Sequence, residues 1–111
     1  MTHAPFVSGL RARNSTIRLA PDGVGVEAIT IRVQMPEVWD VVRIVVSPNE
    51  PVLAVKVRAL EALFPEALMH EDFVLKLRGW EILDEAASLA AAGVIDGSIL
   101  LLTHRRRRPV R

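Results

Sequence analysis

The chain of 111 residues contains no cysteine, although half of its residues are apolar. Without cysteine it has no disulfides, no thiolate metal ligands and no cysteine nucleophile, so it does not hold a substrate as a thioester on its own side chain. The apolar content is sufficient for one domain with its own core. This composition favours a reducing compartment, the cytoplasm, as the setting of the protein.

A secretion signal and a membrane span are also missing from the sequence. The first segment, MTHAPFVSGLRARN, has no apolar core of the signal-peptide kind. No uninterrupted apolar stretch approaches the length that crosses a bilayer. We therefore expect neither signal-peptide secretion nor membrane insertion.

Residues that carry catalysis or bind metals are sparse. His3, His70 and His104 lie far apart in the chain, and no metal-binding spacing links them. The adjacent acids Glu71-Asp72 and Asp84-Glu85 fall in predicted connections, where solvated carboxylates are commoner than an acid/base pair. The chain has no glycine-rich phosphate loop, and no nucleophile stands beside a base. The sequence therefore predicts a protein that is not an enzyme and that needs no metal or cofactor.

The net charge of +1 conceals an uneven distribution. Residues 105–111 contain five arginines, whereas residues 1–104 contain nine Lys/Arg against thirteen Asp/Glu. Clustered arginines displace counterions from phosphates, which is compatible with a nucleic-acid-associated protein. A phosphate-binding protein usually carries basic residues over its folded body as well, so a solvated basic end is an equal interpretation. The residues of this basic run are Arg105, Arg106, Arg107 and Arg108.

Hydrophobic periodicity divides the chain into three parts. Residues 1–27 lack sustained periodicity and are expected to form a flexible extension, with a candidate extra strand at 16–19. Residues 28–104 show strand and helix patterns in succession and form the predicted domain. Residues 105–111 form the basic tail.

Within the domain, two apolar/polar alternations are expected to pair as a hairpin, and the next segment changes to the period of an amphipathic helix. A strand, a short return strand after Gly79, a short second helix and a last apolar strand follow. In chain order, the predicted elements are strands 28–35 and 40–47, a helix between Pro51 and Pro65, strands 73–78 and 81–83, a short helix within 84–97, and a strand at 98–103.

This order of elements is that of the β-grasp, in which one long helix crosses one face of a mixed sheet. Three pieces of the sequence resemble the ubiquitin-like family in order and spacing: VVSPNEPVLAVKV, LKLRGWEILDEAASL and SLAAAGVIDGSILLL. In the third piece, Leu89, Gly93-Val94 and Asp96-Gly97 match the family's approach to its last strand. The resemblance implies an α+β, ubiquitin-like fold with a mixed sheet of four to five strands, one long helix and a short second helix.

The resemblance also implies a docking surface. Ubiquitin uses the outer face of its sheet as an apolar docking patch, whose positions match Lys76, Leu101, Thr103 and the turn at Met35. A lysine replaces the family's isoleucine and a leucine replaces its histidine, so a partner other than the ordinary ubiquitin-binding modules is implied. Lys56 matches a lysine buried in ubiquitin, and by its own pattern it is interpreted as a lysine that snorkels along the helix flank.

Apolar residues also stand at positions that alternation places on the outward side of the sheet. Such a patch is either an interface or is covered by residues 15–27 folding back over it. These residues are Val41, Val45, Val74, Ile99 and Leu101.

The two tryptophans are further contact candidates, because tryptophan is enriched at binding hot spots. Trp80, at a turn apex, is the better candidate, whereas Trp39, at the hairpin tip, is equally suited to covering the end of the core. The predicted partner-binding residues are Lys76, Trp80, Leu101, Thr103, Met35 and Val74.

A conjugated modifier needs a slim C-terminus that ends in glycine. The positions equivalent to the family's Gly-Gly are occupied by Arg108-Pro109, and no glycine follows Gly97. The sequence therefore predicts a non-conjugating docking module, similar to the small YukD-like proteins of bacterial type VII secretion. The alternatives are a modifier of a bacterial ubiquitination-type pathway with an atypical C-terminus, and a nucleic-acid-associated protein. The implied partners are proteins of a secretion system or of a ubiquitin-type pathway.

Overall fold

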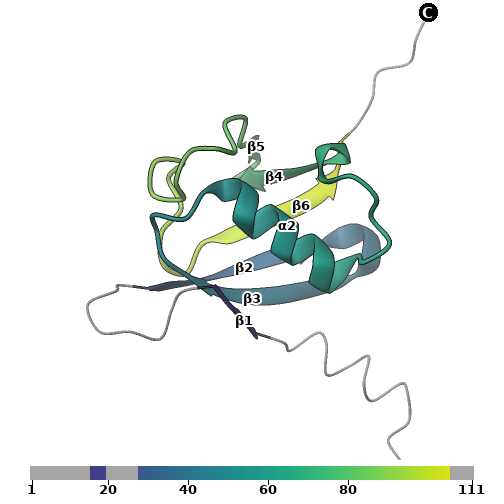
Figure 1. Cartoon of the computed structure of the whole chain (residues 1–111), viewed down its shortest axis with the longest axis horizontal. Helices are drawn as coiled ribbons and strands as arrows, with labels where there is room; N and C mark the ends of the chain where they lie inside the picture. The colour runs from purple at the N-terminus through teal and green to yellow at the C-terminus, as the bar shows by residue number, and fades with distance from the viewer. Residues whose placement is uncertain (1–15, 20–27, 106–111) are drawn as a thin grey trace, which may run out of the picture.

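The computed structural model describes residues 16–19 and 28–105, which form a six-stranded mixed sheet with one α-helix laid across it (Figure 1). The strand order is β1-β3-β2-β6-β4-β5. β2 pairs antiparallel with β3 and parallel with β6, which is antiparallel to β4. The elements are β1 Thr16–Arg18, β2 Ile29–Met35, the 3-10 turn η1 Pro36–Val38, β3 Asp40–Val46, the helix α2 Val52–Leu63, the 3-10 turn η2 His70–Asp72, β4 Phe73–Leu77, β5 Trp80–Glu81 and β6 Ile99–His104.

The core lies between α2 and the sheet face that α2 covers. Ile31 of β2 and Ile44 of β3 stand opposite each other on this face, and both are fully buried. Val52, Val55 and Ala59 form the buried stripe of α2 that packs toward the sheet. The predicted hairpin and long helix are therefore confirmed.

The start of α2 is held by the loop that follows β5. The backbone N–H of Val52 donates to the carbonyl of Ala87 and that of Leu53 donates to the carbonyl of Glu85, both at 2.9 Å. N–H groups in the first turn have no partner within their own helix. Since Pro51 at the N-cap offers no side-chain hydrogen bond, the loop carbonyls take the place of a cap.

Lys56 is the one buried charged residue among residues 16–19 and 28–105, with 1% of its surface exposed. Its Nζ donates to both carboxylate oxygens of Glu85 at 2.8 Å and to the carbonyl of Phe73 at 3.0 Å. The interpretation as a snorkelling lysine is wrong, because these oxygens satisfy the ammonium group inside the protein. The pair ties α2 both to the loop after β5 and to β4.

The segment between β5 and β6 forms consecutive turns instead of the short second helix that the sequence indicates. A single helical turn ends at Gly93, whose φ is 94°. The N–H of Gly93 donates to the carbonyl of Ala90, and the N–H of Val94 donates to the carbonyl of Leu89. This is the Schellman pattern, which stops a helix at a left-handed glycine. The segment is therefore too short to become a second helix, although Leu89 and Val94 are buried in the core.

The candidate extra strand is present as β1, which pairs in parallel with β3 and places Ile17 opposite Ile44. With β1 and the two-residue β5, the sheet has six strands, more than the four to five expected. Because β1 is hydrogen-bonded at the edge, it extends the sheet and does not cover its outer face. The other parts of the extension, residues 1–15 and 20–27, lie outside the described residues, as do residues 106–111 of the tail.

Candidate docking surface

The outer face of the sheet is the face opposite α2. It consists of the alternate residues of each strand that point away from the core. Most of these side chains are exposed or half-buried, and none of the described segments covers the face. From β1 to β5, in spatial order, its members are Thr16 and Arg18; Val41, Arg43 and Val45; Thr30, Arg32 and Gln34; Ile99, Leu101 and Thr103; Val74 and Lys76; and Glu81.

Three of the predicted partner-binding residues lie together on this face. Lys76 stands directly opposite Leu101, and Thr103 follows two residues further along β6. All three are half-buried. The Thr103 hydroxyl donates to Oε2 of Glu37 at 2.6 Å, so its polar group already has a partner within the protein.

Glu37 closes the corner of the outer face beside η1. Its Oε2 also accepts the backbone N–H of His104 at 2.9 Å. Partial burial works to raise the pKa of Glu37, but the hydrogen bonds from His104 and Thr103 together outweigh it, so the pKa lies below its ordinary value of 4.5. A fixed negative charge therefore marks this corner at neutral pH.

The prediction that Met35 contributes to the docking surface is wrong. Met35 is the last residue of β2, and it lies on the side of the strand that faces the core. Only 1% of its surface is exposed. The alternation of β2 continues to its end and carries the side chain inward, away from any partner.

Val74 does lie on the outer face, but only 3% of its surface is exposed. Arg105, which follows β6, forms an ion pair across β4 with Glu81 of β5, with Nη1 and Oε2 3.3 Å apart. This ion pair spans β4, the strand that holds Val74. The prediction of Val74 as a contact residue is wrong, because its side chain is buried within the protein and offers almost no surface to a partner.

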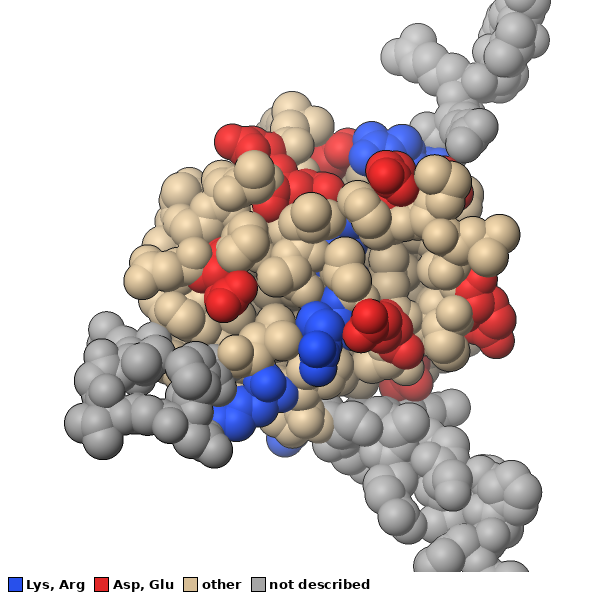
Figure 2. Space-filling view, viewed as in Figure 1, with Lys and Arg blue, Asp and Glu red and all other residues tan. Residues whose placement is uncertain are grey.

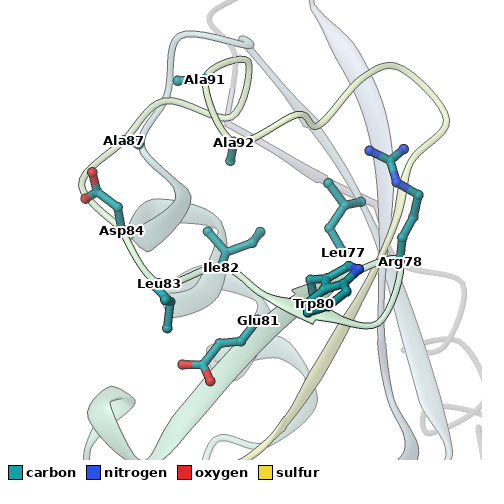
Figure 3. A pocket seen from close by; sticks show the side chains of 10 residues that line it. All are labelled: Leu77, Arg78, Trp80, Glu81, Ile82, Leu83, Asp84, Ala87, Ala91 and Ala92. Carbon is teal, nitrogen blue, oxygen red and sulfur yellow. The ribbon is translucent and has the colours of Figure 1, made fainter.

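Trp80 is exposed, but it lies on the other side of the sheet. It pairs with the core residue Leu77, so the two side chains share the helix side. The indole is 79% exposed and borders a hollow of about 510 Å³. Figure 3 shows Trp80 beside Leu77 at one side of this hollow, with Ile82 across from them. The structure thus separates Trp80 from the pair of Lys76 and Leu101.

The tryptophan that borders the outer face is Trp39. It is 85% exposed, so it does not cover the end of the core. It lines a hollow of about 340 Å³ together with Gln34 and Val41, two outer-face residues. Its φ of 55° is in the left-handed region, which is unusual for a bulky side chain. To place Trp39 at this hollow from the sequence, one would need the register of the hairpin, in which Gln34 stands opposite Val41 and η1 joins the two strands.

Arg105, the first residue of the basic tail, is part of the folded structure. Its Nε donates to the carbonyl of Glu71 at 3.1 Å, in addition to the ion pair with Glu81. Its charge is thus engaged at the β4–β5 edge of the sheet. Arg106, Arg107 and Arg108 lie outside the described residues.

The described residues present binding chemistry on this surface: apolar side chains, guanidinium groups and an ammonium group. In the part of the chain that the structure describes, no three His, Asp or Glu side chains are grouped to hold a metal ion. Within the same residues, no helix has the length and apolar character to cross a membrane.

No protein-family model matches the sequence, and no curated protein matches it. Several solved structures are similar. The ubiquitin-like domain of an Arabidopsis thaliana protein has a TM-score of 0.61 at 18% identity, over 81% of this chain and 90% of that domain. The ubiquitin of Caldiarchaeum subterraneum has a TM-score of 0.60 at 20% identity, over 75% and 100% of the two chains. The ubiquitin-like domain of Plasmodium falciparum Dsk2 has a TM-score of 0.60 at 20% identity, over 71% and 100%.

Identities this low bear on the fold and not on the activity. The sheet order, the single long helix and these structural matches agree with the resemblance found in the sequence. The described domain has a ubiquitin-like β-grasp fold.

Proposed function

We propose that this protein is a non-enzymatic docking module that binds a protein partner through the outer face of its sheet. One observation carries the proposal. Ile99 and Leu101 are adjacent outward residues of β6, and Val41 of β3 lies in line with Leu101 beyond Gln34, on a sheet face that the described segments leave uncovered; Ile99 is 47% exposed. A partner that covers this face gains the free energy of burying apolar surface.

The proposed contact residues are Lys76, Leu101 and Thr103, with Trp39 at the adjacent corner. Lys76 and Leu101 occupy the places of the isoleucine and the histidine in ubiquitin's docking patch. This difference supports a partner distinct from the modules that bind ubiquitin. Trp80 stays a predicted contact residue, but on the helix side of the sheet and apart from this docking surface.

We further propose that the module is not conjugated to targets. Arg108-Pro109 stand at the positions equivalent to the Gly-Gly of conjugated relatives, where side chains obstruct the narrow channel of an activating enzyme. This supports a place beside the YukD-like accessory proteins of bacterial type VII secretion, in the cytoplasm. The alternative is a modifier of a bacterial ubiquitination-type pathway. An ATP-dependent adduct with a cognate activating enzyme would establish that alternative and overturn our proposal.

Affinity capture from a lysate of the source cells tests the docking surface. Full-length wild type is compared with the Leu101→Asp/Lys76→Glu variant, which places two acids in the middle of the outer face. We expect recovery of the partner to fall at least about tenfold, because the interface would have to bury a new, unpaired charge.

The matched control is Leu68→Asp/Arg58→Glu, which makes the same two kinds of change away from the outer face. Leu68 is 95% exposed beyond the end of α2, and Arg58 lies on α2. This control should recover the partner as wild type does, and thermal unfolding monitored by circular dichroism should show both variants folded. Equal recovery by wild type and the outer-face variant, or equal loss in both variants, would count against the proposal.

A further inference from the structure

Positive charge is concentrated on the outer face, although the domain as a whole is acidic. Residues 28–104 contain six Lys/Arg against eleven Asp/Glu. Among the described strands, Glu81 is the one acid at an outward position. The other carboxylates lie on α2, on turns, in loops or beside the core, and Figure 2 shows acidic groups at several separate places on the helix side. The outward strand positions with a basic residue are Arg18, Arg32, Arg43 and Lys76.

Arg32 and Arg43 form the centre of this charge. They stand directly opposite each other on β2 and β3, and both are exposed. Like charges in this cross-strand position destabilise a sheet. Neither arginine forms an ion pair within the described part of the chain. We call this pair the arginine ridge.

On the other half of the outer face, an acid lies close to the positive charges. Lys76 stands directly opposite Glu81, and Glu81 also pairs with Arg105. The same sheet therefore balances its cations at one edge and leaves them unbalanced at the arginine ridge. A stability requirement alone does not produce this pattern, because an acid at either position of the ridge would relieve the repulsion.

Apolar surface lies next to the ridge in two directions, across the sheet at β6 and along the hairpin toward Trp39. Ile99 stands opposite Arg32 on β6 and is 47% exposed. Two residues along the hairpin from the ridge, Gln34 and Val41 line the hollow beside Trp39. The left-handed backbone of Trp39 holds an exposed indole at this hollow, an arrangement that occurs more often at ligand-contacting sites than elsewhere.

We propose that the arginine ridge binds an acidic segment of a protein partner, and that an apolar side chain of the same segment rests against Trp39. The inference rests on the proposed function, since it takes the outer face as the docking surface, and it names the chemistry of the partner. Guanidinium groups bind carboxylates through paired N–H donors. Adjacent strands are roughly 5 Å apart, so two carboxylates of one short segment reach both arginines.

A protein segment fits this site better than a nucleic acid does. A long polyanion would extend beyond the ridge and meet a domain with five more acids than bases. A short acidic segment meets only the ridge. The apolar residues next to the ridge, Ile99 and Trp39, also match a peptide with mixed side chains better than a phosphate backbone.

Fluorescence anisotropy with the full chain tests the proposal at about 0.15 M salt, where charges are screened beyond about 8 Å. The probes are a labelled, short, glutamate-rich peptide with one leucine, the same peptide with glutamine in place of glutamate, and an oligo-dT of equal net charge. We expect wild type to bind the acidic peptide in preference to the other two. The Arg32→Gln/Arg43→Gln variant should bind it roughly tenfold more weakly.

Two control variants separate the ridge from charge in general. Arg58→Gln/Arg78→Gln removes the same charge from α2 and from the β4–β5 turn, and its affinity should stay within about twofold of wild type. Arg106→Gln/Arg107→Gln/Arg108→Gln removes charge from the tail only. The ridge variant should unfold at the same temperature as wild type or at a higher one, because it removes a repulsion.

Tryptophan emission tests the apolar contact. The chain has two tryptophans, so in a Trp80→Phe variant the emission comes from Trp39 alone. Addition of the acidic peptide should shift this emission to shorter wavelength as the indole leaves water. An unchanged emission on binding would remove Trp39 from the site.

The remaining outcomes are decisive. Absence of binding by wild type, equal weakening in both arginine-pair variants, or weakening in the tail variant alone would overturn the proposal. Tighter binding of oligo-dT that depends on the ridge would replace the protein partner with nucleic acid. A negative result here, together with partner loss in the Leu101→Asp/Lys76→Glu capture, would leave the docking function standing and reject only the acidic segment.

Discussion

On the helix side of the sheet, Lys56 is buried and paired with an acid, whereas on the outer face Arg32 and Arg43 stand opposite each other and pair with no acid of the described segments. The ammonium group of Lys56 has three oxygen partners within 3.0 Å. The arginine ridge has none of its own in the described residues. Both sites are cationic, and they lie on opposite sides of the same sheet.

The contrast separates two uses of positive charge. Lys56 joins three segments, α2, β4 and the loop after β5, so its charge contributes to holding the fold together. Arg32 and Arg43 form no ion pair with residues 16–19 or 28–105, and their repulsion weakens the pairing of β2 with β3. A charge that costs stability and remains exposed is available to a partner.

The largest expected effect concerns the buried ion pair of Lys56 with Glu85. Glu85→Ala leaves the ammonium group of Lys56 buried without its counter-charge, which should lower the free energy of unfolding by about 3 kcal/mol. Urea denaturation followed by circular dichroism measures this loss. The exposed pair of Arg58 and Glu61, 3.6 Å apart, supplies the comparison: Glu61→Ala should cost no more than about 0.5 kcal/mol.

A double variant distinguishes a lost ion pair from a lost contact. Lys56→Met/Glu85→Leu removes both charges and keeps most of the volume, so it should recover a large part of the stability lost in Glu85→Ala. If the double variant is the less stable of the two, packing and not charge would explain the effect.

The next effect concerns the strain at the corner of the outer face. The left-handed conformation costs a residue with Cβ roughly 1–2 kcal/mol, and Trp39→Gly removes this cost. The greater flexibility of glycine in the unfolded chain offsets roughly half of the gain in stability. We expect a net stabilisation of about 0.5–1 kcal/mol, a rise of a few degrees in the unfolding temperature. Binding of the acidic peptide should weaken in the same variant.

Arg78→Gly provides the matched control, because Arg78 is the other described non-glycine residue with positive φ, at 53°. It belongs to the β4–β5 turn, away from the outer-face hollow. The variant should gain stability in the same way and keep its affinity for the peptide. A loss of affinity in both variants would show that flexibility, and not the indole, governs binding.

The fold was predictable because its signals are local. The alternation of β2 and β3 and the stripe of α2 each depend on residues within one element. The same alternation correctly assigns Lys76 and Leu101 to the outer face, where they are half-buried. It also assigns Met35 to the inner face, so the family-based position of Met35 conflicted with a signal present in the chain.

The remaining features depend on residues far apart in the sequence. Lys56 is enclosed by Glu85, 29 positions away. Val74 is buried although alternation places it on the outer face, and Arg105 pairs with Glu81, 24 positions away. Trp39 became a site residue only through the left-handed turn after η1. Alternation identifies which way a side chain points, but not what covers it.

The smallest expected effect is a pH dependence at Glu37, the acid that the outer face does keep at its corner. Its pKa is lowered in the folded protein, chiefly through hydrogen bonds that outweigh its partial burial. The stability that it contributes is therefore present above its unfolded pKa and is lost as the pH falls through the lower, folded value. Because the carboxylate is largely exposed, we expect the effect to be smaller than that of Trp39→Gly.

Glu37→Gln should therefore be slightly less stable than wild type at neutral pH, and the difference should vanish as both are taken toward about pH 3. Unfolding temperatures across this range measure it, with Glu61→Gln as the control for an exposed helix carboxylate. A difference between wild type and Glu37→Gln that stays constant with pH would mean that the hydrogen bonds from Thr103 and His104 stabilise the carboxylate no more than the protonated carboxyl group. In that case, the negative charge at this corner would be incidental to the fold, and Glu37 would stabilise the corner through its hydrogen bonds alone.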